Sequence, residues 1–149
     1  MNCQIVTATK ADEEILKNLF QFYIYDFSEF MNLDVEANGR YREYSLDGEN
    51  LSPYFIKNDT KYIGFVLVDK DETSNCILEF FIMKKYRREG IGKSAAKEIF
   101  RLHKGNWVVH QISANKPAQA FWRNVIAEFT EGNFIEGEEE GKVVQKFTS

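Results

Sequence analysis

The spacing of hydrophobic residues predicts a strand and then a helix at the beginning of the chain. Residues 3–8 form a short apolar run that is typical of a strand. Residues 11–30 have helical spacing, with an apolar face made of Ile15, Leu19, Phe22 and Tyr23. The helical pattern degrades over residues 26–44, whose polar and glycine content predicts a loop with one further helical turn.

The rest of the chain alternates between extended and helical patterns. Extended runs at residues 53–57, 62–68 and 76–83 are joined by short polar turns, which indicates an antiparallel meander. After Gly90 the spacing becomes helical as far as residue 102, and a strand follows at residues 107–112. Asn115 and Pro117 are typical of a helix start, and residues 133–136 and 142–148 could close a final hairpin.

This order of elements predicts an α+β fold around a mixed, mostly antiparallel sheet. The strand–helix–strand unit in residues 76–113 implies one parallel pair of strands. With 44% hydrophobic and 28% charged residues, the composition is that of an ordinary soluble globular protein. The length of 149 residues suits a single domain, which we expect to span residues 1–149.

Charge and cysteine content narrow the classes of function. A net charge of −4 argues against a nucleic-acid partner, because sequence-independent binding needs a basic face. The longest apolar runs, such as residues 77–83, are too short to span a bilayer, and the N-terminus lacks a signal core. Cys3 and Cys76 lack metal-ligand spacing and read as buried thiols. We therefore expect a cytoplasmic protein with no membrane partner and no metal.

Residues 86–94 combine glycines with cations between a strand and a helix. Residues 92–94 match the end of a nucleotide-binding P-loop, but Arg87 stands where that motif needs its first glycine. The dinucleotide motif needs a parallel sheet, which the predicted meander contradicts. It also needs a later acidic residue, and the 107–113 segment has none. What remains is a loop whose amides and cations suit a small anion such as a pyrophosphate. A solvated loop is the alternative.

This loop and a second motif after the next predicted strand resemble the GNAT superfamily of N-acetyltransferases. Residues 87–92 (RREGIG) resemble its [Q/R]-x-x-G-x-[G/A] acyl-CoA loop, and residues 115–118 (NKPA) resemble its Asn-x-x-Ala run. Residues 79–134 also resemble one bacterial branch of the superfamily. The resemblance implies a central sheet of about six to seven strands, about four flanking helices and one splayed parallel pair.

The resemblance implies acetyl-CoA as co-substrate. Its pyrophosphate would rest on the loop amides, and its pantetheine arm would pair with residues 81–83 like an added strand. Asn115 would reach the pantetheine, although it would also serve as a plain helix cap. The implied cofactor-binding residues are Phe81, Ile82, Met83, Arg87, Arg88, Glu89, Gly90, Ile91, Gly92, Lys93, Asn115 and Trp122.

The implied reaction is the attack of an amine on the thioester. The amide of Ile82 would polarise the thioester carbonyl. Glu79, alone in an apolar run, is the leading base, and the alternative is a solvated strand residue paired with a lysine. Trp122 stands where the superfamily often has a tyrosine that protonates the thiolate. Another tyrosine could take that role, the thiolate could leave unassisted, or the protein could bind CoA without turnover.

The predicted function is acetyl-CoA-dependent N-acetylation of a primary amine of a small molecule or a peptide. Asp26 and Glu29 are the candidates for binding the ammonium group of the acceptor, and a polar helix end is the alternative. A non-catalytic acyl-CoA-binding module and a purely structural domain are the competing functions. The final strand could pair at a sheet edge in a homodimer.

Overall fold

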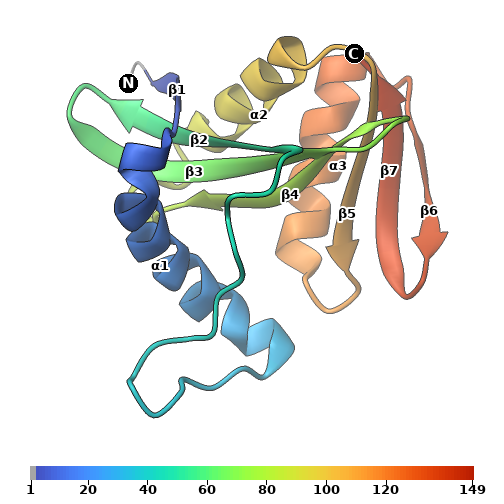
Figure 1. Ribbon diagram of the computed structural model, residues 1–149. Coiled ribbons are helices and arrows are strands. Elements are labelled where there is room, and N and C mark those ends of the chain that lie inside the picture. Colours follow the sequence, from blue (N-terminus) through green and yellow to red (C-terminus); the bar gives the residue numbers. More distant parts are fainter. Residues whose placement is uncertain (1–2) are drawn as a thin grey trace.

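One mixed sheet forms the centre of the computed structural model, which describes residues 3–149 (Figure 1). The remaining residues of the predicted domain, 1 and 2, lie outside the described part. In chain order the strands are β1 (Gln4–Thr7), β2 (Leu51–Asn58), β3 (Lys61–Lys70), β4 (Asn75–Ile82), β5 (Asn106–Ile112), β6 (Ile135–Glu139) and β7 (Lys142–Thr148). They lie in the order β1-β2-β3-β4-β5-β7-β6, and only β4–β5 is parallel. The predicted fold class is confirmed.

Three α-helices pack on this sheet within the described residues, rather than about four. They are α1 (Glu13–Met31), α2 (Ile91–Leu102) and α3 (Lys116–Thr130), with two short 3-10 helices, η1 (Lys10–Asp12) and η2 (Lys84–Tyr86). In the segment 26–44, α1 itself continues to Met31, and no separate helical turn forms in residues 33–44. Instead the Gln21 side chain donates to the Tyr41 carbonyl and accepts from the Tyr41 N–H, both at 2.9 Å. These bonds from α1 satisfy the loop backbone in place of helical bonds.

The two faces of the sheet carry separate cores. On one face, α1 buries Leu16, Leu19, Phe20 and Ile24. The predicted apolar face was therefore wrong for Phe22, whose side chain is 55% exposed, while Leu19 is buried as expected. On the other face, α2 and α3 pack over a second core that includes Trp107 and Trp122. Figure 1 shows α1 on one side of the sheet and α2 and α3 on the other.

The parallel pair of strands separates soon after it forms. Only Asn75↔Trp107 and Cys76↔Val108 register between β4 and β5. A bulge interrupts β4 just beyond this pairing, since Leu67 of β3 is opposite Glu79 whereas Val68 is opposite Ile77. The rest of β4 therefore has a free edge toward β5, as the sequence resemblance implied.

The final strand does not lie at an edge of the sheet, which corrects one expectation. β7 is enclosed between β5 and β6, and the edges are formed by β1 and β6. Because its backbone groups are already paired on both sides, β7 cannot add a partner strand. Pairing between two copies of the chain would have to use β6 or β1, and a homodimer stays a prediction.

Candidate active site

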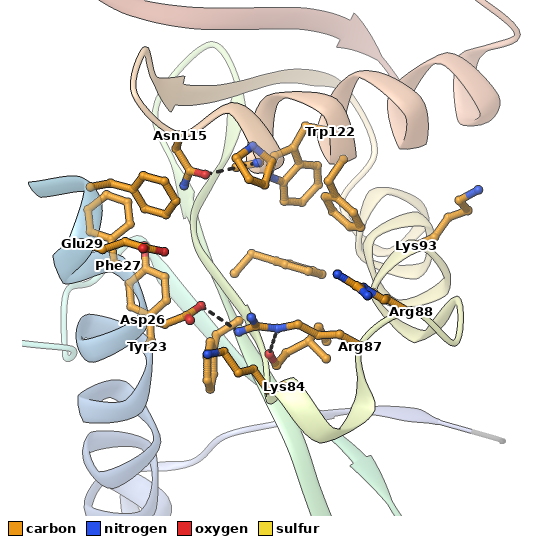
Figure 2. A pocket seen from close by; sticks show the side chains of 18 of the residues that line it. Tyr23, Asp26, Phe27, Glu29, Lys84, Arg87, Arg88, Lys93, Asn115 and Trp122 are labelled. Atoms are coloured by element: carbon orange, nitrogen blue, oxygen red, sulfur yellow. Dashed lines mark hydrogen bonds and ion pairs between the residues drawn. The ribbon is translucent and has the colours of Figure 1, made fainter.

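A cavity of about 700 Å³ opens where β4 and β5 separate (Figure 2). Its wall is formed by α1, the end of β4, the loop that precedes α2, and the start of α3. Most of the predicted site residues line it: Asp26, Glu29, Phe81, Ile82, Arg87, Arg88, Gly90, Gly92, Lys93, Asn115 and Trp122. Glu79, Met83, Glu89 and Ile91 are the predicted site residues outside this lining.

The backbone before α2 forms a concave turn at the rim of the cavity. Arg88 and Gly90 both adopt left-handed conformations, with φ of 67° and 79°, and Gly90 is the N-cap of α2. No side chain caps this helix, so the N–H groups of its first turn point outward without an intrahelical acceptor. A Cβ on Gly90 would have no atom within 4 Å, so the approach to these donors is open.

Gly92 is required for a different reason than Gly90. A Cβ there would lie 3.3 Å from the Phe121 ring and 3.5 Å from Ile82. The absence of a side chain thus lets α2 approach α3 and the end of β4 closely. Ile91, the residue between the two glycines, is only 4% exposed and anchors the helix in the core.

Two of the loop cations are already engaged within the protein. Arg87 Nε donates to the carbonyl of Ile82 at 2.7 Å, and its guanidinium pairs with Asp26 at 2.8 Å (Figure 2). The Lys93 ammonium pairs with Glu128 of α3. Arg87 therefore fastens the loop to both β4 and α1, and Asp26 is neutralised. Arg88 is exposed at the cavity and makes no ion pair within residues 3–149.

The free edge of β4 presents the backbone of Ile82 to the cavity. The Met83 N–H donates to the Ile63 carbonyl of β3 at 2.9 Å. Since neighbouring residues in a strand direct their N–H groups to opposite sides, the Ile82 N–H faces away from β3. Ile82 therefore has the orientation expected of an oxyanion donor. Met83 does not, because its amide is used by β3 and its side chain lies outside the cavity.

Glu79 lies behind the cavity wall, on the face of the sheet that α1 covers. Its register opposite Leu67 places it on the α1 side of the sheet, near Tyr23 and Tyr44. Burial raises the pKa of the Glu79 carboxyl to about 7, although hydrogen bonding from both tyrosines favours the charged form. The alternative of an outward residue paired with a lysine is wrong.

Asn115 and Trp122 contribute from α3. The Asn115 side chain accepts a hydrogen bond from the Ala118 N–H at 3.2 Å, so it caps the helix and also lines the cavity. Trp122 is 6% exposed and packs edge-on against Phe80 and Phe121. Its ring is thus part of the aromatic wall of the cavity as well as of the core.

Sequence reasoning missed the aromatic wall that α1 supplies. Tyr23, Phe27 and Phe30 all line the cavity, and Figure 2 shows Tyr23 and Phe27 beside Glu29. The available signal was their spacing, since residues 23, 27 and 30 fall on one helical face together with Asp26. Tyr23 was instead assigned to the buried stripe of the helix.

The acetyltransferase (GNAT) family matches residues 14–125, which is most of the chain. The chain belongs to the GNAT family. The prediction of an acetyltransferase is therefore confirmed, while the match names neither an acceptor nor a branch of the superfamily. A search of curated protein sequences finds no significant match.

Solved GNAT structures share the fold at low sequence identity. An acetyltransferase from Thermus thermophilus has a TM-score of 0.74 at 10% identity, covering 100% of this chain and 98% of the other. The PaiA N-acetyltransferase of Thermoplasma acidophilum, in complex with coenzyme A, gives 0.65 at 11% identity and covers 100% of both chains. The ribosomal-protein-S18-alanine N-acetyltransferase of Escherichia coli gives 0.61 at 11%, covering 99% and 94%.

Residues 3–149 contain neither a metal-binding cluster nor a membrane-spanning helix. Among residues 3–149, no group of three or more His, Cys, Asp or Glu side chains could hold a metal ion. In the same part of the chain, every helix is too short or too polar to cross a membrane.

Proposed function

We propose that this protein transfers the acetyl group of acetyl-CoA directly to a primary amine. One observation carries this proposal: the uncapped N-terminus of α2, opened by Gly90, borders the same cavity as the free edge of β4. The first-turn N–H groups would bind the pyrophosphate, assisted by Arg88. The pantetheine arm would extend along β4 toward Asn115, as an added strand.

The chemistry follows from the groups around Ile82. The amine nitrogen forms a bond with the thioester carbonyl carbon while the Ile82 N–H stabilises the negative charge on the carbonyl oxygen. The carbon–sulfur bond then breaks, and CoA leaves as a thiolate. Trp122 cannot protonate that thiolate, but a thiol pKa of about 8.5 makes unassisted departure feasible near neutral pH.

An acceptor that binds as an ammonium ion loses two protons. The first goes to solvent before the nitrogen attacks, and the second passes to Glu79 in this proposal once the carbon–nitrogen bond has formed. Glu79 does not line the cavity, whereas its neighbour Tyr23 does. The Tyr23 hydroxyl therefore relays the proton: it receives one from the amine and donates its own to the carboxylate. With a pKa of about 7, Glu79 can accept a proton at neutral pH and return it to solvent.

The remaining expectations fit this function. The acceptor is a small-molecule or peptide amine whose ammonium group binds near Glu29, beside the Asp26–Arg87 pair. We further propose that the chain acts as a single domain. A cytoplasmic location agrees with its two free thiols, Cys3 and Cys76.

A non-catalytic acyl-CoA-binding module is the second candidate, because Trp122 replaces the usual proton donor.

Acetyl transfer is tested by mixing the protein with acetyl-CoA and a panel of primary amines. The expected result is amine-dependent release of free CoA thiol, together with a product heavier by one acetyl group in mass spectrometry. Binding of acetyl-CoA without thiol release from any amine would contradict catalysis and favour the non-catalytic module.

A further inference from the structure

Only some of the charged side chains in the cavity wall form ion pairs within the part of the protein that the structure describes. Asp26 and Arg87 neutralise each other at 2.8 Å, and Lys93 is paired with Glu128. The other charged residues of the wall, Glu29, Lys84 and Arg88, make no ion pair with any residue of 3–149. Glu29 is thus the carboxylate of this wall that no internal cation neutralises.

These unneutralised charges lie at different ends of the cavity. Arg88 belongs to the segment before α2, whereas Glu29 belongs to the last turn of α1. Lys84 lies on the α1 side, beside the Asp26–Arg87 pair (Figure 2). Figure 2 shows Glu29 and Arg88 on opposite sides of the cavity. The cavity is therefore cationic where the donor phosphates would bind and anionic at the opposite end. A cationic acceptor suits that anionic end, and an anionic one would be repelled.

The surface around Glu29 is apolar and aromatic. Phe27 and Phe30 line the cavity on either side of Glu29 in the sequence, with ring centroids 6.5 Å apart. Tyr23 stacks on Phe27 at 5.7 Å, and burial raises the pKa of its hydroxyl, which keeps the group neutral. An ammonium group would interact favourably with these rings as well as with Glu29. An apolar body would replace water on them.

We infer that the acceptor is a primary amine with an apolar body and no anionic group of its own. Its ammonium group binds Glu29, and its body contacts Phe27 and Phe30. This inference rests on the proposed function, because it assigns the anionic end of the cavity to the acceptor. The ammonium group loses its first proton to solvent, and the proton released once the carbon–nitrogen bond forms follows the route through Tyr23 to Glu79.

The test is a calorimetric titration of amines into protein saturated with CoA, which requires no turnover. 2-Phenylethylamine and phenylalanine differ by one carboxylate, and ethylamine lacks the ring. 2-Phenylethylamine should bind at least about tenfold more tightly than either of the others. Glu29→Gln should weaken its binding about tenfold without changing the affinity for CoA. Glu14→Gln, an exposed glutamate in the first turn of α1, is the matched control and should change neither.

Several outcomes would overturn the inference. They are equal binding of phenylalanine and 2-phenylethylamine, unchanged affinity in Glu29→Gln, and no binding of any of the three amines. CoA affinity, measured in the same samples, separates this inference from the proposed function. If CoA binds but the amine pattern fails, the acceptor class is wrong; if CoA itself does not bind, the proposed function is wrong.

Discussion

At the scale of single residues, Glu79 has the environment of a base that works at neutral pH. The carboxyl is buried on the α1 side of the sheet, where burial raises its pKa to about 7. The neighbouring Tyr23 and Tyr44 hydroxyls act to lower that pKa, and Tyr23 also lines the cavity. In the proposed mechanism, this arrangement keeps the base out of bulk water while the Tyr23 hydroxyl connects it to the acceptor.

We predict that kcat/KM for acetyl transfer rises as the pH increases through about 7, because Glu79 must be ionised to accept a proton. Glu79→Gln should lower kcat about 10²-fold or more and remove that pH dependence. The pH–rate profiles of both proteins with one amine provide the measurement. A Glu79→Gln variant with the wild-type profile would exclude the relay.

The raised pKa of Glu79 also affects folding stability, which should fall, rather than rise, as the pH increases. Because the folded state raises the carboxyl pKa from 4.5 to about 7, the neutral form is favoured by folding. That stabilisation is complete below pH 4.5 and is lost as the pH rises toward 7. Glu79→Gln should therefore be more stable than wild type at pH 8, and the difference should shrink at pH 4.5. Urea unfolding at the two pH values measures this difference.

At the scale of elements, the junction of β3 and β4 holds the Ile82 amide in place. Gly64 of β3 is opposite Ile82, and a Cβ on Gly64 would lie 1.9 Å from the Phe81 carbonyl oxygen. The two strands are therefore closer here than any residue with a side chain allows. This contact fixes the part of β4 that borders the cavity.

We predict that Gly64→Ala destabilises the fold by about 3 kcal/mol, since the obstructing atom belongs to the backbone and cannot rotate away. Gly137→Ala in β6 is the matched control, because a Cβ there meets nothing within 4 Å. Chemical denaturation compares the two variants. Equal stability of Gly64→Ala and the control would contradict this account of the junction.

The sequence predicted those parts of the elements that local patterns determine. The order of strands and helices, the turn at Gly90 and the Asn115 cap all depend on neighbouring residues. The Arg87–Asp26 bond joins residues 61 positions apart, and the Lys93–Glu128 bond joins residues 35 apart, so neither was predictable. The path of the loop at residues 32–50 could not be predicted either, because it depends on a hydrogen bond from Gln21 of α1.

At the scale of the whole molecule, two independent cores hold the walls of one cavity. The α1 side carries Glu79 and the aromatic wall proposed to bind the acceptor, while the α2–α3 side carries Trp122 and the loop proposed to bind phosphate. The separation of β4 from β5 brings both to the same opening. An acidic protein with a net charge of −4 thereby presents a cationic loop at one end of its cavity.

The most direct test of this account is thermal unfolding of the wild type, Gly90→Glu and Gly90→Ala, with and without acetyl-CoA. A ligand that binds only the folded state adds about 2.7 kcal/mol at a hundredfold excess over its Kd. Gly90→Ala carries only the left-handed strain of a Cβ, about 1 kcal/mol, and should retain this gain. Gly90→Glu should lose it, because its carboxylate would occupy and repel the phosphate site. The absence of any gain in the wild type, or an equal gain in Gly90→Glu, would contradict the account.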